Sequence, residues 1–336
     1  MSPTEQILRG ERRAIARQIS GIENDRLEAR QVLAELYPST GRAYLVGLTG
    51  APGTGKSTLA NELAKAYRRE NKTVAIISVD PTSPFTGGAI LGDRIRMHDL
   101  AGDPGVFVRS MATRGSLGGL ARATADAAKV FDAAGFEIIL IETVGVGQAE
   151  VEIAGLAHSV VVVEAPGLGD EVQAIKAGIL EIADVFVVNK ADREGASRTV
   201  AALNMMLDLT HHTLPKTVLH HGLLMEAAAT GSDKNPGAEA GWRPPVCQTV
   251  ATQGQGIDEV VRALVEHRTY QQASGVLARR ERERLIFEIQ QLLKERLLAD
   301  LLAQTHPEQI NATLEQVVER QLDPYTAVEQ LLNGER

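Results

Sequence analysis

From residue 44 onward, short apolar runs alternate with longer stretches rich in Ala and Leu. The apolar runs are strand-sized and rich in β-branched residues, and they cover residues 45–49, 73–79, 106–108, 138–141, 160–163, 185–188 and 246–251. Residues 57–69, 117–133 and 172–182 lie between runs and are long enough for helices. Fully apolar strands that alternate with helices predict an α/β fold with a doubly wound, mostly parallel sheet. Ligands bind such sheets beyond the carboxyl ends of the strands.

Helical patterns flank this region on both sides. Residues 4–36 place apolar side chains at helical spacing among Arg and Glu, with Gly21 as the expected interruption, and the segment 38–41 ends this arm. Residues 211–245 are irregular and predict a surface excursion. A charge-rich run at 279–284 opens a long amphipathic helix, and two further helical segments follow at 309–321 and 323–334. These last helices either close the same core or pair with a second subunit, and the pattern alone does not decide between the two.

Composition narrows the class of protein. The chain has 336 residues, 44% of them hydrophobic, and a formal net charge of −8, which argues against a general nucleic-acid binder. The single cysteine, Cys247, excludes an intrachain disulfide, and no Cys/His cluster has zinc spacing. No apolar run near the N-terminus has the length of a signal peptide, and none elsewhere could span a membrane. We therefore expect a soluble cytoplasmic protein with no nucleic-acid or membrane partner.

The strongest motif lies between the first predicted strand and its helix. It fits G-x-x-x-x-G-K-[ST] completely and consists of Gly50, Ala51, Pro52, Gly53, Thr54, Gly55, Lys56 and Ser57. Its glycines let successive backbone N–H groups face phosphates at the N-terminus of a helix. Lys56 is expected to reach the β- and γ-phosphates, and the Ser57 hydroxyl to ligate Mg²⁺. The motif predicts a nucleoside triphosphate as ligand.

A second motif, N-K-x-D, follows the predicted strand at 185–188. It contains Asn189, Lys190 and Asp192. The Asp192 carboxylate can accept hydrogen bonds from the ring N–H and the exocyclic amine of guanine, a donor pair that adenine lacks. After the last predicted strand, a backbone N–H in the loop that begins at Ala251 is expected to contact the base.

Acidic and basic residues at other strand ends are candidates for the metal and the catalytic step. Glu142 and Gly145 stand where GTPases usually have D-x-x-G, and the glycine N–H is expected to meet the γ-phosphate. No Gln follows Gly145 directly, which predicts slow intrinsic hydrolysis. Asp80 and Asp93 are candidate Mg²⁺ carboxylates, although they fit equally a turn starter and a helix cap. A guanidinium nearby, from Arg94 or Arg96, would stabilise developing phosphate charge.

Together these motifs resemble the methylmalonyl-CoA mutase-associated GTPases, the MeaB or ArgK group of bacteria with its human MMAA-type counterpart. The resemblance covers nearly the whole chain and includes residues 50–58, 80–97, 110–119, 142–152, 166–192 and 323–325. This family belongs to the metallochaperone-like group of SIMIBI P-loop GTPases. It implies a helical extension over residues 1–41, a G domain over 42–272 and a helical dimerisation arm over 273–336.

The resemblance also implies a function. It is that of a GTP-hydrolysing chaperone that gates cofactor loading and protects an adenosylcobalamin-dependent acyl-CoA mutase. Lys56, Arg96 and Glu142 would be catalytic, and Ser57, Asp80, Asp93 and Glu142 would surround Mg²⁺. The nucleotide would also contact Thr58, and the segments 142–151 and 167–182 would act as switches. No D-x-H-x-x-G signature is present, so cobalamin is expected on the partner rather than on this chain.

Two other classes of function compete with this one. A P-loop kinase or a transport-associated ATPase, an older label of ArgK-like chains, would need ATP preference and an acceptor pocket. A nickel-type metallochaperone GTPase of the same group would be expected to show a His-rich tract or a Cys/His pair. The N-K-x-D motif argues against the first. The eight histidines, which are scattered or stand in doublets at 211–212 and 220–221, argue against the second.

Overall fold

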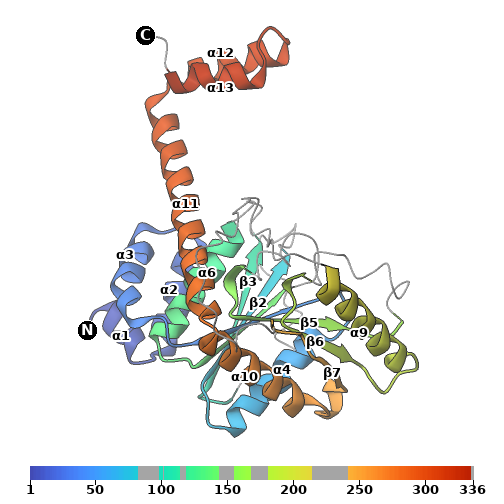
Figure 1. The fold of residues 1–336 in the computed structure, drawn as a ribbon. Coiled ribbons are helices and arrows are strands. Elements are labelled where there is room, and N and C mark those ends of the chain that lie inside the picture. Colours follow the sequence, from blue (N-terminus) through green and yellow to red (C-terminus); the bar gives the residue numbers. More distant parts are fainter. Residues whose placement is uncertain are drawn as a thin grey trace, which may run out of the picture. The chain divides into compact units, whose positions relative to one another are not determined.

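Seven parallel strands form the sheet in the described part of the chain, in the order β3-β2-β4-β1-β5-β6-β7 (Figure 1). The strands are β1 Tyr44–Thr49, β2 Val74–Pro81, β3 Val106–Thr113, β4 Ile138–Thr143, β5 Ser159–Glu164, β6 Val185–Asn189 and β7 Val246–Thr249. The chain winds from the central β1 to one side and later to the other. β1 therefore ends where the winding reverses, which is the usual ligand position in such sheets.

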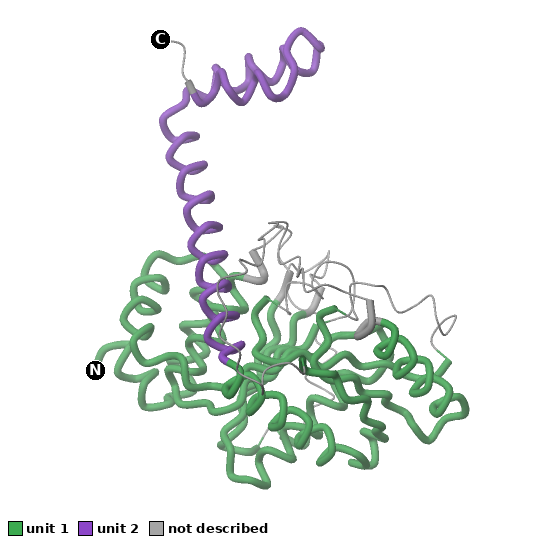
Figure 2. The backbone as a smooth tube through the Cα atoms, viewed as in Figure 1, with its two compact units in different colours: residues 1–274 green, residues 275–336 purple. Residues whose placement is uncertain are grey.

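The computed structural model describes residues 1–81, 98–100, 102–113, 119–143, 155–167, 181–213 and 241–333. The chain divides into two compact units, residues 1–274 and 275–336 (Figure 2). The first unit contains the whole sheet with its covering helices, and the described residues of the second form three helices joined by short turns.

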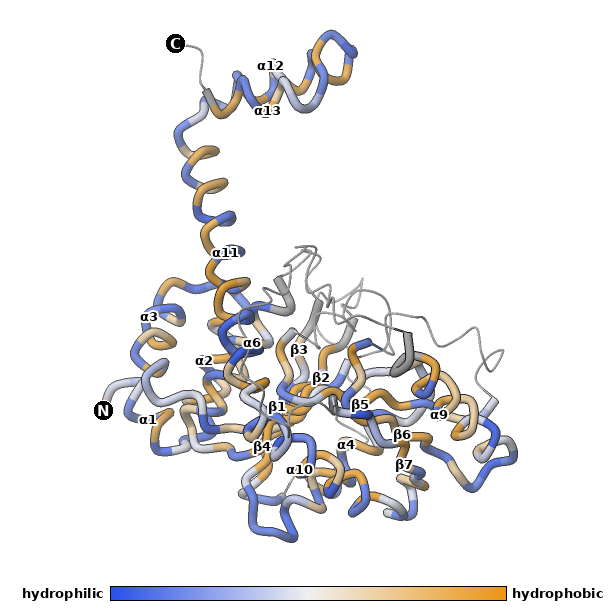
Figure 3. The backbone as a smooth tube through the Cα atoms, in the orientation of Figure 1, coloured by the Kyte–Doolittle hydropathy of each residue, from blue (hydrophilic) through white to orange (hydrophobic). Residues whose placement is uncertain are grey.

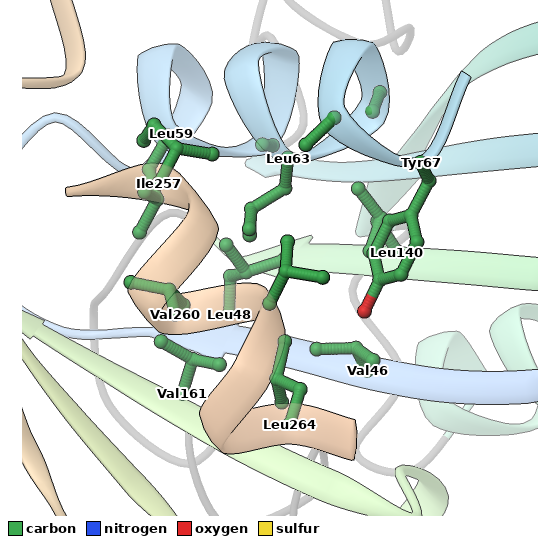
Figure 4. Packing of buried hydrophobic residues seen from close by; sticks show 14 of the residues in the cluster. Val46, Leu48, Leu59, Leu63, Tyr67, Leu140, Val161, Ile257, Val260 and Leu264 are labelled. Atoms are coloured by element: carbon green, nitrogen blue, oxygen red, sulfur yellow. The ribbon is translucent and has the colours of Figure 1, made fainter. Parts of the chain in front are cut away.

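One face of the sheet is covered by α4 Lys56–Arg69 and α10 Ile257–Ala273. Val46 and Leu48 of β1 point to this face because alternate residues of a strand share a side. Leu63 of α4 and Leu264 of α10 pack against them (Figure 4). Burial of these side chains removes apolar surface from water, and this fixes the N-terminus of α4 directly beyond the end of β1.

The other face is covered by the N-terminal helices together with α6 Gly119–Ala133 and α9 Ala196–Thr213. The N-terminal helices are α1 Pro3–Leu8, α2 Arg12–Glu23 and α3 Leu27–Leu36. An ion pair between Glu23 and Arg109 of β3 ties α2 to the sheet.

Our expectation that Gly21 interrupts the N-terminal helix is wrong. Gly21 lies inside α2 and is buried, and the helical segments separate at residues 9–11 and 24–26 instead. A Cβ at this position would lie 2.9 Å from the Cβ of Ala29 in α3. Gly21 therefore serves the close approach of two helices and is not a helix breaker.

The predicted strands and the α/β class are confirmed, with changes at the ends of elements. The helix predicted at 57–69 is α4, and the one at 117–133 is α6 from residue 119 on. The last strand ends at Thr249, and a 3₁₀ turn, Ala251–Gln253, follows it. The helices α9 and α10 were not predicted. Residues 172–180 and 214–240 of two predicted segments lie outside the described residues.

A buried polar network ties α10 to the amino edge of the sheet. The Ser159 hydroxyl lies 2.6 Å from Nδ1 of His267, and His267 Nε2 lies 3.2 Å from the Asp184 carboxylate. The three residues are at most 5% exposed, so this Ser-His-Asp set is out of reach of a substrate. Tyr44 OH extends the network, lying 2.5 Å from Ser159 Oγ and donating to the Leu264 carbonyl at 3.0 Å. Burial raises the pKa of Tyr44, which keeps its hydroxyl protonated.

Trp242 lies near this network, just before β7, and Cys247 lies within that strand. Trp242, the one tryptophan of the chain, packs against the tilted rings of His267 and Tyr270, with 4.8 Å and 5.5 Å between the ring centroids. Its indole N–H donates to the Asp184 carbonyl at 2.7 Å. Cys247 of β7 is buried, and burial raises the pKa of its thiol to about 12, so it stays protonated near neutral pH.

The second unit consists of α11 Val276–Gln304, α12 Pro307–Val318 and α13 Pro324–Asn333. Hydrophobic residues recur along α11 (Figure 3). Seven of its large apolar side chains are exposed within this chain. They are Ile286, Ile289, Leu292, Leu293, Leu297, Leu298 and Leu302. No helix among the described residues is both long and apolar enough to cross a bilayer.

Candidate nucleotide site

The loop between β1 and α4 curls tightly around its own backbone. Gly50 has φ +130°, and a Cβ there would lie 2.1 Å from the carbonyl oxygen of Val163 in β5. Gly55 has φ +96°, and a Cβ there would lie 2.3 Å from Nδ2 of Asn189. Only glycine fits at both positions, because the backbone takes the left-handed region and approaches its neighbours too closely for a side chain.

Lys56 is held over this loop. Its Nζ donates to the carbonyls of Gly50 at 2.8 Å and Ala51 at 3.0 Å, and the residue is 6% exposed. Thr54 closes the turn by donating its hydroxyl proton to the Ala51 carbonyl at 2.9 Å. A buried ammonium and the positive end of α4 are thus directed to one place, which suits the phosphates of a nucleotide.

Ser57 and Glu142 meet beside the loop. The Ser57 hydroxyl, in the first turn of α4, donates to Oε1 of Glu142 at the end of β4 over 2.5 Å. Both side chains are more than nine-tenths buried. A hydroxyl and a carboxylate are hard oxygen donors of the kind that Mg²⁺ prefers, so this pair fits a magnesium site. No group of three or more potential His, Cys, Asp or Glu ligands is found among the described residues.

Asn189 connects the predicted base-reading segment to the phosphate loop. Its Nδ2 donates to the carbonyl of Thr54 at 2.8 Å. Its Oδ1 accepts from the Thr249 hydroxyl and from the Ala251 N–H, both at 3.1 Å. All three loops of the site are therefore joined through one buried amide. The sequence motifs did not include Thr249, although its place at the end of the last strand was a possible signal.

Lys190 and Asp192 extend from the same strand end. The Lys190 backbone has φ +57°, which is uncommon for a residue with a side chain, and its Nζ donates to the Gly53 carbonyl at 2.7 Å. Lys190 thereby spans the gap between the N-K-x-D segment and the phosphate loop. Asp192 is exposed and lies two residues farther along, where its carboxylate can meet a ligand.

Other predicted site residues are located in part. Thr58 follows Ser57 in α4, and Pro52 is exposed in the phosphate loop. Asp80 lies near the end of β2, in register with Ala112 of β3 and at the same edge of the sheet as Glu142. Asp93, Arg94, Arg96 and Gly145 lie outside the described residues, as does most of the two predicted switch segments.

The sequence matches a family model over residues 13–306. The model describes the methylmalonyl-CoA mutase-associated GTPase MeaB. The chain belongs to the MeaB family. A protein of Pyrococcus abyssi is 48% identical over 98% of this chain and 94% of its own length. The GTPase ArgK of Escherichia coli is 32% identical over 96% of this chain and 92% of its own.

Two further comparisons extend the MeaB family assignment. The mitochondrial methylmalonic aciduria type A homolog of Mus musculus is 31% identical over 98% of this chain and 77% of its own length. The crystal structure of a LAO/AO transport system kinase aligns with a TM-score of 0.70 and 26% identity, covering 98% of this chain and 95% of that one. The chain is thus a GTPase of the MeaB group with a P-loop fold, and nucleotide and Mg²⁺ binding are general features of that class.

Proposed function

We propose that this MeaB-family GTPase is a chaperone of an adenosylcobalamin-dependent acyl-CoA mutase, and that GTP gates cofactor loading and protects the mutase. The family description names the mutase, and the mouse relative is named for methylmalonic aciduria. The cobalamin would stay on the partner. We infer a cytoplasmic location and slow intrinsic hydrolysis, the latter from the absence of Gln after Gly145.

The observation that carries the nucleotide assignment is the Asn189 amide, which joins the phosphate loop to the N-K-x-D and Ala251 loops. In this proposal the Asp192 carboxylate accepts from two donors of guanine, and the Lys190 stem covers the ring. The Ala251 N–H donates to Asn189, so a contact with the base would require it to be shared.

At the phosphate end, Lys56 would hold the β- and γ-phosphates, and Gly145 and Thr58 would make further contacts. Ser57 and Glu142 would hold Mg²⁺, with Asp80 and Asp93 as further carboxylates around it. When bound, Mg²⁺ neutralises charge on the phosphate oxygens. Arg96 would place a guanidinium on the charge that develops during transfer to water.

A binding experiment tests the chaperone role. The purified protein is immobilised and presented with methylmalonyl-CoA mutase in GDP or in a nonhydrolysable GTP analogue. We expect the mutase affinity to differ about five-fold or more between the two nucleotides, as in other coupled binding equilibria. Lys56→Ala is the control, because it should bind mutase equally in both. Equal affinity in the wild type would contradict gating by the nucleotide. A kinase or transport ATPase, the competing class, would instead show ATP preference and no response to the mutase.

We also propose that the chain forms a homodimer through its C-terminal helices. Leu293 and Leu297 of α11 are 55% and 60% exposed within this chain. A helix that exposes so many large apolar side chains usually covers them with a partner.

The double variant Leu293→Asp/Leu297→Asp tests the dimer. Sedimentation velocity at micromolar concentration should give a dimer for the wild type and a monomer for the variant, because two carboxylates cannot be buried unpaired. Lys294→Asp, an exposed position on the same helix beside the apolar stripe, should remain dimeric. If the double variant Leu293→Asp/Leu297→Asp stays dimeric, the interface lies elsewhere.

A further inference from the structure

Polar side chains line one face of the sheet beneath the N-terminus of α4. Ile76 of β2 and Leu140 of β4 belong to the core that α4 covers. Two residues farther along each strand, Ser78 and Glu142 point to the same face, because strand side chains alternate with a period of two. Ser78 and Glu142 are also direct partners in the register of β2 and β4. Their backbones are therefore about 4.8 Å apart, the usual spacing between strands.

The Ser78 hydroxyl is buried and has no hydrogen-bond partner among the residues that the structure describes. The residue is 1% exposed. A buried hydroxyl without a hydrogen bond destabilises the folded state, because its hydrogen bonds to water are lost on folding and are not replaced. Its position beside the carboxylate that contacts Ser57 suggests that the hydroxyl is used when ligand is bound.

A second buried polar atom lies on the helix above this strand. Asn61 is 5% exposed, and its Oδ1 likewise has no hydrogen-bond partner among the described residues. Asn61 follows Ser57 by one turn of α4 and precedes Arg68 by two, so the three residues share one side of the helix.

The partners of its two neighbours locate Asn61 over β2. Ser57 contacts Glu142 in β4, and Arg68 binds Asp103, which precedes β3. The strand between β4 and β3 is β2, so Asn61 lies on the side of α4 that passes over β2.

We propose that Ser78 is a positioning residue for Glu142 and acts with Asn61 through one ordered water. The water donates to Asn61 Oδ1 and to the Glu142 carboxylate and accepts from the Ser78 hydroxyl. Three such hydrogen bonds are what a buried water typically makes. These hydrogen bonds orient the Glu142 carboxylate beside Ser57. They thereby hold one ligand of the proposed magnesium site in place. This inference rests on the proposed function of that site.

The variant Ser78→Ala separates this role from a packing role. We measure how the release of a fluorescent GDP analogue depends on Mg²⁺ concentration. The Mg²⁺ concentration that gives half of the maximal slowing of release should rise about ten-fold or more in Ser78→Ala. This is the usual size of the effect when a group that orients a metal ligand is lost. The urea midpoint of the protein without nucleotide and Mg²⁺ should change little, because the variant removes no hydrogen bond to a described protein group and keeps the packing of this face. Asn61→Leu should raise the same Mg²⁺ concentration, and the two effects should not add, since both variants lose the same water.

Thr124→Val is the matched control. Thr124 of α6 also has a buried hydroxyl without a partner among the described residues, but it lies on the opposite face of the sheet. This variant should leave the Mg²⁺ dependence unchanged. If Ser78→Ala also leaves it unchanged while the wild type responds to Mg²⁺, the positioning role is refuted. If the wild type itself does not respond to Mg²⁺, the proposed metal site falls and the positioning role falls with it.

Discussion

Lys56→Ala is expected to abolish tight binding of GTP. The Lys56 ammonium is fixed by two carbonyls of the phosphate loop and is the buried cation of that loop. Charged hydrogen bonds contribute roughly 1.5–3 kcal/mol each, so the loss of contacts to two phosphates should weaken binding on the order of 10²- to 10⁴-fold. Isothermal titration calorimetry with GTP and Mg²⁺ measures the change.

Lys72→Ala is the control for the lost charge. Lys72 makes an exposed ion pair with Glu137 and is remote from the phosphate loop in sequence. Its removal should leave the GTP affinity within about two-fold of the wild type, because exposed pairs contribute little. Micromolar GTP binding by Lys56→Ala would contradict the assignment of the loop as the phosphate site.

Asp192→Asn is expected to change the base that the protein prefers. A carboxylate offers two acceptors to the ring N–H and the amine of guanine. An amide offers one acceptor and one donor, which match the ring N–H and the second oxygen of xanthine. A site that leaves a buried polar group unpaired can discriminate between two ligands by about 10⁴-fold or more. The GTP affinity of the variant should therefore fall steeply while its XTP affinity rises. Competition of GTP, XTP and ATP against a fluorescent nucleotide measures all three.

Asp208→Asn makes the same chemical change away from the site. Asp208 pairs with Arg243 on the exposed side of α9, and its variant should keep the wild-type order of nucleotides. An unchanged preference for GTP in Asp192→Asn would remove this residue from the base-binding site. A wild type that prefers ATP would exclude guanine recognition altogether.

The sheet was predictable because its strands are apolar on both faces. Runs such as 138–141 and 185–188 have no polar face, and only a parallel sheet covered by helices on both sides buries them fully. The phosphate loop was predictable because its glycines and its lysine lie in an unbroken stretch, so that no long-range contact is needed to recognise them.

Contacts between distant segments were not predictable in the same way. Nothing local distinguishes Gly21 as a helix-crossing residue, since that role depends on Ala29 in the next helix. The link from Asn189 to Thr249 and Ala251 joins residues 60 and 62 positions apart. The pairing of Ser78 with Glu142 follows from the order of the strands, which a linear pattern does not contain. Local motifs therefore indicate single loops, whereas the sheet determines which loops meet.

The position of Trp242 provides an optical probe. Its indole packs against the rings of His267 and Tyr270 and donates to the Asp184 carbonyl, so the one tryptophan lies at the amino edge of the sheet, opposite the phosphate loop. A nucleotide at the carboxyl edge cannot quench this fluorophore by contact. A change of its emission on nucleotide binding would therefore measure a rearrangement that extends beyond the nucleotide site, with no label attached to the protein.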